Sequence, residues 1–351
     1  MAERTRVGLV GVTGYTGMEL CRLLAAHPDL ELAAATSRAE AGRTLAELYP
    51  FLTGTPMADL AVTEPDPVAL ARDCRVVFLA VPHKTAQHLA RAIVDAGSKV
   101  VDLSADFRLR DPETYEQWYA TPHSQRPLLD EAVYGLPEFY AEAIGRARLV
   151  ANPGCYPTSA ILGLAPALAA GLVEPDGLVV DSKSGVSGAG RGANVGTLFC
   201  EVHDSFKAYN LGKHRHTPEI EQELSRVADA GLTLVFSPHL VPMDRGILTT
   251  SYARLKRAVD ADAAQAAYED FYKGHRFVRV LPQGTLPETR WVRGTVHCDV
   301  GVVVEPRTGR LIAVSAIDNL CRGASGQAVM NANLMLGLEL GRGLNSAPMM
   351  P

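Results

Sequence analysis

A glycine-rich turn near the start of the chain constrains the fold most strongly. The apolar run at residues 6–10 leads into Gly11, Gly14 and Gly17, and apolar residues at helical spacing continue to Ala26. A strand, a glycine turn and a helix in this order begin a βαβ unit, because glycine permits the tight turn and close helix–sheet packing. Further strand-like runs lie at 30–35, 75–81, 99–103 and 147–151, and they alternate with helical segments. We therefore predict an α/β, doubly wound parallel sheet for residues 1–151.

The same turn is typical of a dinucleotide site, since backbone N–H groups at a helix start face the pyrophosphate. The next strand ends in residues 34–38 without the carboxylate that usually binds the ribose 2′-hydroxyl of NAD, whereas Ser37 and Arg38 can bind a 2′-phosphate. The sequence therefore favours NADPH over NADH. The predicted cofactor contacts in the turn are Gly11, Thr13, Gly14, Tyr15, Thr16 and Gly17.

The pattern changes after residue 152. Strand-like runs predominate at 178–184, 232–238, 247–255, 292–304 and 311–316, with helices predicted at 157–170, 259–272 and 326–340. Runs of strands with few helices favour an antiparallel or mixed sheet, so we predict an α+β domain over 152–322. Residues 185–212 are rich in glycine and polar side chains and are predicted as a long loop. Residues 323–351 form a closing helical segment.

Composition excludes several classes of function. With 351 residues, about two domains are expected. The net charge of −5 is not accompanied by a basic stripe, so no nucleic-acid partner is predicted. No run approaches ~18 apolar residues, and the first residues do not resemble a signal peptide, so we expect a cytoplasmic protein without membrane contact. The six cysteines include no CxxC pair, which argues against structural zinc.

Cys155 stands out among the cysteines because of its surroundings, Asn-Pro-Gly-Cys-Tyr-Pro-Thr at 152–158. Proline and glycine bend the chain after a strand, and a helix is predicted to begin near Pro157. Cys155 would then lie at a helix N-terminus, where the helix dipole favours the thiolate. It also lies at the predicted domain boundary. We predict that Cys155 is a nucleophile.

A second motif is His214-Arg-His-Thr-Pro-Glu-Ile at 214–220. Thr217 and Pro218 are predicted as the N-cap and first residue of a helix, which places both histidines on the preceding loop. A histidine near a thiolate can stabilise it and transfer protons. His-x-His also occurs in metal sites, but no carboxylate or cysteine follows at ligand spacing. No metal is predicted.

Two further segments carry candidate binding residues. Ser-Gly-Val-Ser-Gly-Ala-Gly-Arg at 184–191 combines a flexible backbone with Arg191, which can bind an anion in a bidentate manner. Ser104-Ala-Asp-Phe-Arg108 follows a strand end, where ligands of doubly wound sheets gather. Asp106 and Arg108 can equally form a structural ion pair, and the residues alone do not decide between these roles.

Together, the motifs resemble those of the N-acetyl-γ-glutamyl-phosphate reductases, in the longer of that family's two size classes. The resemblance spans nearly the whole chain in one order. It includes Gly-Val-Thr-Gly-Tyr-Thr-Gly at 11–17, the segments at 104–108, 152–158, 184–191 and 214–220, Pro-His-Leu-Val-Pro-Met-Asp-Arg-Gly-Ile at 238–247, and Asp-Asn-Leu-Cys-Arg-Gly-Ala-Ser-Gly-Gln at 318–327.

The resemblance implies a Rossmann domain followed by a catalytic domain of the glyceraldehyde-3-phosphate and aspartate-semialdehyde dehydrogenase type. It implies that NADPH reduces N-acetyl-L-glutamyl 5-phosphate to the 5-semialdehyde and phosphate in arginine biosynthesis, through a thioester on Cys155. His214 would be the acid/base, with His216 as the alternative, and the protein would be a homodimer or homotetramer. The closing helix would pack on the nucleotide domain. The binding residues that follow are Ser184, Arg191, Arg215, His216 and Arg108 for substrate, and Ser104 with Asn331 (or Asn319) for cofactor.

Other functions remain open. A similar lysine-pathway reductase acts on a carrier-bound aminoadipyl phosphate, although its cysteine motif lacks the flanking Asn-Pro and Tyr-Pro. A non-catalytic NADP sensor could keep the glycine turn, but Cys155 and His214 argue against it. An aldehyde dehydrogenase working oxidatively with phosphate would use the same chemistry in reverse. A zinc-dependent alcohol dehydrogenase is disfavoured because no zinc-binding cysteine cluster is present.

Overall fold

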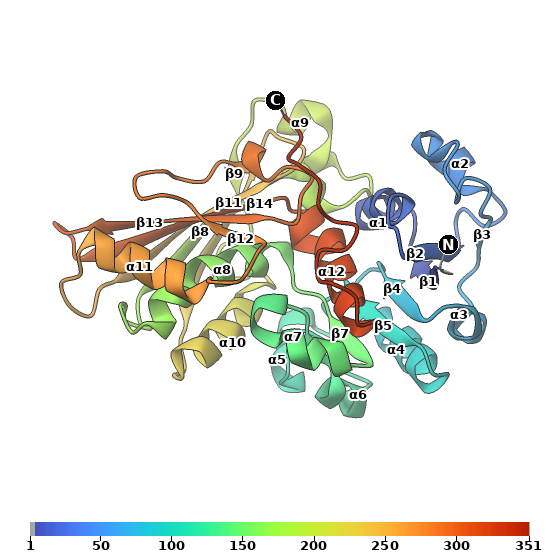
Figure 1. Ribbon diagram of the computed structural model, residues 1–351, viewed down its shortest axis with the longest axis horizontal. Helices are drawn as coiled ribbons and strands as arrows, with labels where there is room; N and C mark the ends of the chain where they lie inside the picture. Colours follow the sequence, from blue (N-terminus) through green and yellow to red (C-terminus); the bar gives the residue numbers. More distant parts are fainter. Residues whose placement is uncertain (1–3, 351) are drawn as a thin grey trace. The chain divides into compact units, whose positions relative to one another are not determined.

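A computed structural model describes residues 4–350. The chain divides into two compact units, which are described separately. One is Met1–Pro153 with Ala324–Asn345, and the other is Gly154–Gly323 with Ser346–Pro351 (Figure 1). The boundaries fall close to the predicted residues 151 and 322, but residues 346–350 differ from the prediction. They belong with the second unit, where the backbone N–H of Met349 donates to the carbonyl of Arg293 at 3.0 Å.

The first unit is built on a seven-stranded sheet in which every strand pair is parallel. The strand order is β3-β2-β1-β4-β5-β7-β6, so the chain builds outward in one direction from β1 and then returns to add β4 on its other side. This confirms the predicted doubly wound sheet. The strands are β1 (Thr5–Val10), β2 (Leu30–Thr36), β3 (Val62–Thr63), β4 (Val76–Leu79), β5 (Lys99–Asp102), β6 (Val133–Tyr134) and β7 (Leu149–Ala151).

Helices pack on the strands of this sheet, which explains the continuous apolar runs of β4 and β5. Leu70 of α3, Ile93 of α4 and Leu128 of α6 share one buried core with Val77 and Val100. Helix α12 packs separately and contacts α1, α7 and β5. The helices are α1 (Tyr15–Ala25), α2 (Leu45–Leu48), η1 (Pro50–Leu52), α3 (Pro67–Asp73), α4 (Ala86–Asp95), α5 (Pro112–Tyr119), α6 (Arg126–Glu131), α7 (Pro137–Arg146) and α12 (Gly326–Met335).

The second unit contains a mixed seven-stranded sheet of order β12-β13-β14-β11-β8-β10-β9. The pairs β12–β13 and β8–β10 are parallel and the others are antiparallel. This agrees with the α+β architecture predicted for this part of the chain. The strands are β8 (Leu178–Gly185), β9 (Lys207–Ala208), β10 (Leu234–Val241), β11 (Ile247–Arg254), β12 (Val278–Val280), β13 (Cys298–Glu305) and β14 (Arg310–Ile317).

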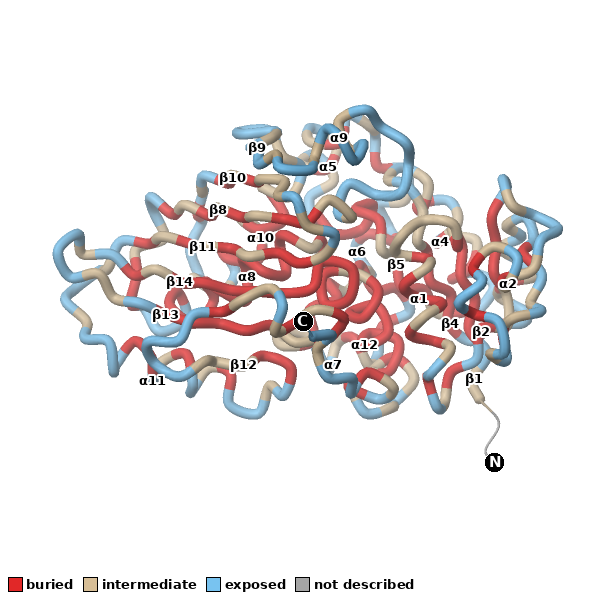
Figure 2. The backbone as a smooth tube through the Cα atoms, turned by 90° about the horizontal axis from the view of Figure 1, so that it is seen from above, coloured by how far each residue is buried: buried red, intermediate tan, exposed pale blue. Residues whose placement is uncertain are grey.

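Three helices cover one face of this sheet: α8 (Cys155–Ala169), α10 (Thr217–Ala228) and α11 (Ala261–Phe271). Figure 2 looks onto the sheet with α8 and α10 behind it. A buried hydroxyl chain ties α8 to the strands, because Ser159 Oγ lies 2.9 Å from both Thr249 Oγ1 and Ser315 Oγ. The burial of β11 alternates along its length, so every second side chain faces away from the helices.

Several elements differ from the sequence prediction. The helix expected near Pro157 begins two residues earlier, at Cys155. Residues 292–297 are not part of a strand, because the η4 turn (Thr289–Trp291) and Gly294 at φ 75° interrupt the run. The closing helix ends at Met335, shortly before Gly337 at φ 73°. The predicted loop 185–212 contains four short elements, namely η2 (Val186–Ala189), η3 (Val195–Thr197), α9 (Phe199–Val202) and β9.

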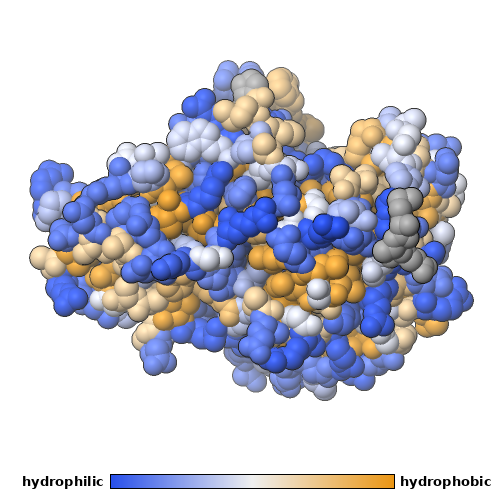
Figure 3. Space-filling view, viewed as in Figure 1, coloured by the Kyte–Doolittle hydropathy of each residue, from blue (hydrophilic) through white to orange (hydrophobic). Residues whose placement is uncertain are grey.

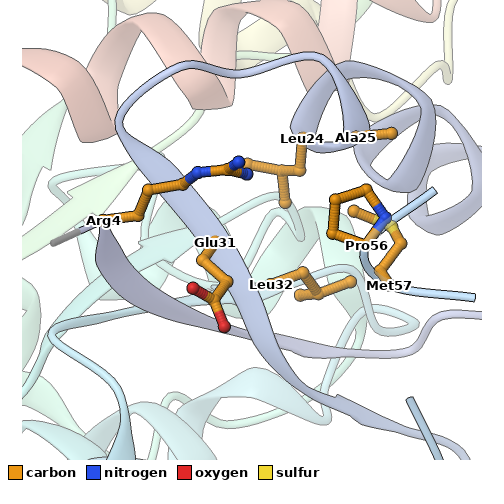
Figure 4. A pocket seen from close by; sticks show the side chains of 7 residues that line it. All are labelled: Arg4, Leu24, Ala25, Glu31, Leu32, Pro56 and Met57. Atoms are coloured by element: carbon orange, nitrogen blue, oxygen red, sulfur yellow. The ribbon is translucent and has the colours of Figure 1, made fainter. Parts of the chain in front are cut away.

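Within residues 4–350, no helix is both long and apolar enough to cross a membrane. Hydrophilic side chains surround the apolar patches on the face drawn in Figure 3. One pocket of the first unit is lined by Arg4, Leu24, Ala25, Glu31, Leu32, Pro56 and Met57 (Figure 4). Arg4 precedes β1 and Glu31 lies near the start of β2, so this pocket is at the amino ends of the strands, opposite the glycine turn.

Candidate active site

Two of the three glycines in the turn of the first unit have no room for a side chain. Gly11 has φ 90°, and a Cβ there would lie 2.3 Å from the carbonyl oxygen of Ala80. A Cβ on Gly17 would lie 2.4 Å from the carbonyl oxygen of Gly11. Gly14 is the N-cap of α1 and supplies no capping side chain, and the first turn of α1 carries no acidic residue. The N–H groups there are therefore oriented to bind an anion such as a pyrophosphate.

The end of β2 lies directly beside this turn, because the backbone N–H groups of Gly11 and Val12 both donate to the carbonyl of Thr36. Ser37 and Arg38 follow at once. Ser37 is mostly buried and its N–H donates to Thr63, whereas Arg38 is exposed. A hydroxyl and a guanidinium beside the dinucleotide turn, with no carboxylate in the Thr36–Arg38 segment, fit a 2′-phosphate.

Three other predicted residues in the first unit have side chains engaged by the protein. Ser104 donates through its N–H and its Oγ to the Asp102 carboxylate at 2.9 and 2.8 Å. Arg108 is buried and donates to the carbonyls of Leu103 and Asn152, both at 2.8 Å. Asn331, fully buried, donates to Asn152 Oδ1 at 3.0 Å and to the carbonyl of Gly135. These side chains brace the carboxyl ends of β5 and β7, and the direct ligand contacts predicted for them stay untested.

The carboxylates at the end of β5 are unusual in their burial. Asp102 is completely buried, and this burial, together with the nearby charge of Asp106, raises its pKa to about 7. Asp106 is also buried and accepts hydrogen bonds from the N–H groups of Lys84 and Ala86 and from the hydroxyl of Tyr115. Asp106 therefore holds the loop that follows β4.

In the second unit, Cys155 is the first residue of α8 and is half-buried. A side chain fixes the turn before Cys155, because Gly154 N–H donates to Oε1 of the buried Glu219 at 2.8 Å. Glu219 belongs to α10, so it joins the cysteine turn to the helix that follows the two histidines. Sequence reasoning placed Glu219 in a motif but gave it no role.

Gly323 packs directly against Cys155. A Cβ on Gly323 would lie 2.6 Å from Cys155 Cβ and 3.0 Å from its Cα. Gly323 lies in the π-helical turn η5 (Cys321–Ser325), a rare conformation that is frequent at functional sites. The motif at 318–327 contained this glycine, but no local pattern indicated that it packs on a cysteine far away in the chain.

His214 lies in an aromatic cage. The centroid of its ring is 5.5 Å from those of Tyr156 and Tyr209, 5.2 Å from Phe236 and 4.9 Å from His216. Its Nδ1 accepts the backbone N–H of His216 at 3.1 Å, which assigns the proton of the neutral ring to Nε2. Burial, with the nearby positive charge of Arg215, lowers the pKa of His214 to about 4. His214 is therefore a neutral Nε2–H donor at physiological pH.

Two tyrosines link the cage to the cysteine. Tyr156 follows Cys155 in α8, and its hydroxyl accepts from Tyr209 Oη at 3.0 Å and donates to the carbonyl of His239 at 3.2 Å. Burial, with a further contribution from the charge of Cys155, raises the pKa of Tyr209 to about 12. Burial also raises the pKa of Tyr156 strongly. Both phenols therefore stay protonated, and the ring of Tyr156, the neighbour of Cys155 in the chain, packs against the ring of His214.

The remaining predicted residues of the second unit differ in their burial. Ser184 is buried at the end of β8, hydrogen-bonds to Tyr156 and donates to the carbonyl of Gly185. His216 is the N-cap of α10, a position predicted for Thr217. Arg215, between the two histidines, and Arg191, after η2, are exposed. Among residues 4–350, no three or more His, Cys, Asp or Glu side chains form a group that could hold a metal ion.

Gly323→Ala is expected to lower kcat by about 10²-fold, because the new methyl group must displace Cys155, the predicted nucleophile. The rate of Cys155 alkylation by iodoacetamide should fall in parallel, and NADPH binding should be unchanged. Gly231→Ala is the matched control, since its Cβ would meet nothing within 4 Å. Wild-type kcat in the Gly323 variant would show that this contact does not position the thiol.

Comparison with known proteins agrees with this geometry. Residues 6–147 match the family "Semialdehyde dehydrogenase, NAD binding domain", and residues 155–319 match "Semialdehyde dehydrogenase, dimerisation domain". Among solved structures, the fold is similar to aspartate semialdehyde dehydrogenase II of Vibrio cholerae complexed with ASA (TM-score 0.71, 17% identity, 96% of this chain and 99% of that one). It is also similar to aspartate semialdehyde dehydrogenase of Candida albicans with NADP (TM-score 0.72, 17% identity, 95% and 99%).

Curated relatives share about half of the sequence over nearly the full length. The N-acetyl-gamma-glutamyl-phosphate reductase of Desulfotalea psychrophila is 51% identical over 347 residues, 99% of both chains. The proteins of the same name from Desulforudis audaxviator and Geobacter sulfurreducens are 54% and 52% identical, over 97% and 99% of both chains. The chain belongs to the N-acetyl-gamma-glutamyl-phosphate reductase family.

Proposed function

We propose that the protein reduces N-acetyl-L-glutamyl 5-phosphate to N-acetyl-L-glutamate 5-semialdehyde and phosphate with NADPH, a step of arginine biosynthesis. The observations that carry the proposal are a cysteine at a helix start and, in the same unit, a half-buried histidine whose tautomer is fixed by the His216 N–H. The substrate follows from the name shared by relatives at 51–54% identity.

Cys155 begins the reaction as the nucleophile. Its position as the first residue of α8 favours the thiolate. The sulfur attacks the acyl carbon, a C–S bond forms, and the bond between that carbon and the phosphate oxygen breaks. Phosphate leaves with the electron pair and a thioester remains on Cys155. Covalent catalysis of this kind divides one difficult displacement into two easier steps.

The first unit supplies the cofactor site. The turn from Gly11 to Gly17 would hold the pyrophosphate, and Ser37 with Arg38 would hold the 2′-phosphate. NADPH, when bound there, supplies the hydride that reduces the thioester. Gly14 leaves the helix start open, because the nearest atom to a Cβ there would be Thr16 Oγ1 at 3.8 Å.

His214 assists the second half of the reaction. A neutral imidazole with its proton on Nε2 can donate a hydrogen bond to the oxyanion of the tetrahedral species on Cys155. The oxyanion then reforms the carbonyl as the thiolate leaves and the aldehyde is released, and the proton stays on Nε2. In the reverse direction the same hydrogen bond stabilises the oxyanion that forms when the Cys155 thiolate attacks the aldehyde. Arg191 and Arg215 are proposed anchors for the anionic groups of the substrate.

The reaction is tested most simply in reverse. NADP⁺ reduction that requires phosphate should be fastest with N-acetylglutamate semialdehyde, with aspartate semialdehyde, glyceraldehyde 3-phosphate and the aminoadipate homologue assayed in parallel. Preference for the longer homologue would assign the protein to the lysine pathway. A folded protein that binds NADPH and is inactive with all four would be the non-catalytic sensor.

The second unit matches a dimerisation domain, and we propose that a homodimer forms through the sheet face that looks away from α8. Side chains in register across this face are Val235, Val179, Tyr252, Ile312 and Val303. Val235 is 59% and Val303 36% exposed. A flat apolar row on a sheet face fits pairing with a second copy of the same sheet.

Val235→Asp is expected to shift the protein to monomers in size-exclusion chromatography with light scattering, because it places a charge in the apolar row. Val68→Asp, on α3 of the first unit, is the control, since Val68 is 68% exposed and does not belong to this sheet. An unchanged dimer in the Val235 variant would exclude this face as the interface.

A further inference from the structure

Lys84 has a strained backbone that the protein holds in place. Its φ is 75°, the left-handed region that side chains other than glycine rarely adopt. The buried carboxylate of Asp106 accepts the N–H of Lys84 through Oδ1 at 2.7 Å and the N–H of Ala86 through Oδ2 at 3.0 Å. Tyr115 Oη donates to Oδ1 of the same carboxylate at 2.8 Å. Such strain persists when surrounding groups impose it, and it is concentrated at ligand sites.

The position of Lys84 in the loop after β4 indicates which ligand it can bind. The strand order reverses between β1 and β4, and ligands of doubly wound sheets bind outside the carboxyl ends of the strands at this switch point. Val10 pairs with Leu79, so the two strands end at the same level. The loop after β4 touches the glycine turn, since a Cβ on Gly11 would meet the carbonyl of Ala80 at 2.3 Å. Lys84 is exposed in this loop.

Charge is arranged on both sides of the glycine turn. Arg38 follows β2 on one side of β1, and Lys84 follows β4 on the other. The nearby carboxylate of Asp106 is buried and occupied by hydrogen bonds from three donors. Two cations that flank a helix start fit a ligand with two separate phosphate groups. Arg38 is on the side where the 2′-phosphate would bind. Lys84 is therefore the cation that can bind the pyrophosphate.

We propose that the Lys84 ammonium binds the pyrophosphate of the nicotinamide dinucleotide, and that Asp106 is a positioning residue that aims the loop at it. The inference rests on the proposed function for the identity of the dinucleotide. It gives Asp106, in the motif at 104–108, a role that its sequence did not reveal.

The test uses the dissociation constants of NADPH and NADH for the full-length protein, measured by nucleotide fluorescence. Lys84→Gly should weaken both nucleotides by the same factor, about tenfold, and reduce the salt dependence of binding. Lys84→Arg should bind both nearly as well as the wild type. Arg38→Ala should weaken NADPH alone, because NADH has no 2′-phosphate. The melting temperature of Lys84→Gly should not fall, since glycine is favoured at this φ.

If the wild type binds NADPH and Lys84→Gly binds both nucleotides with unchanged affinity, this inference is overturned and the proposed function is not. A loss confined to NADPH would also overturn it, by placing Lys84 at the 2′-phosphate. Failure of the wild type to bind NADPH would contradict the proposed function and with it this inference.

Discussion

Cys155→Ser is expected to lower turnover by about 10⁴-fold or more, the scale seen when a covalent nucleophile is removed. Serine is nearly the same size, and its hydroxyl is not ionised at neutral pH, so neither a thioester nor an equivalent acyl intermediate forms at a useful rate. The fold and NADPH affinity should be unchanged, because the glycine turn belongs to the other compact unit. Steady-state kinetics, melting temperature and a fluorescence titration measure all three.

Cys200→Ser is the matched control for this experiment. Cys200 is an exposed cysteine in α9, and its replacement should leave kcat unchanged. Near-normal turnover in Cys155→Ser would end the thioester mechanism. A loss of activity in Cys200→Ser comparable to that in Cys155→Ser would show that the assay reports general damage.

His214→Asn is expected to lower kcat by about 10²–10⁴-fold, the usual contribution of a placed proton donor. The KM should change less, because His214 acts on a charge that develops only during reaction. His216→Asn should have a smaller effect, since the backbone N–H of His216, rather than its ring, fixes the His214 tautomer. If His216→Asn proves the more damaging change, the acid/base role belongs to His216.

The lowered pKa of His214 gives a pH prediction for the same enzyme. Its pKa is about 4 because burial and the charge of Arg215 disfavour the imidazolium. The neutral donor is therefore fully present at pH 6 and is lost only as the pH falls through about 4. A pH–kcat profile in the reductive direction should show no limb from His214 near 6.5. A limb there that disappears in His214→Asn would contradict the half-buried, neutral histidine.

The fold was predictable where local patterns were strong. The glycine turn and the apolar run of β4 predicted the parallel sheet, and the runs at β8, β11 and β14 predicted the mixed sheet. Helices α3 and α5 were not predicted, although each begins with Asp-Pro, a capping aspartate followed by a proline in the first turn. That signal was present in the sequence and could have identified both helices.

The site was predictable only in part, for a physical reason. The motifs around Cys155 and His214 predicted their roles as nucleophile and acid/base, and these roles stay predictions. Gly323 against Cys155, and Glu219 behind Gly154, are tertiary contacts between segments far apart in the chain, and one sequence carries no pattern for them. The left-handed backbone of Lys84 could not be predicted either, because no residue type near it in the sequence indicates that conformation. The substrate contacts of Arg191 and Arg215 stay predictions.

The central claim is that Cys155 carries the acyl group. Mixing the enzyme with N-acetylglutamate semialdehyde and NADP⁺ without phosphate should give a burst of about one NADPH per active site, because the thioester forms and cannot be released by phosphate. Peptide mass spectrometry of the acid-quenched mixture should find an N-acetylglutamyl group on Cys155, and added phosphate should remove it. Steady phosphate-dependent turnover without this adduct, or an adduct on another residue, would contradict the account.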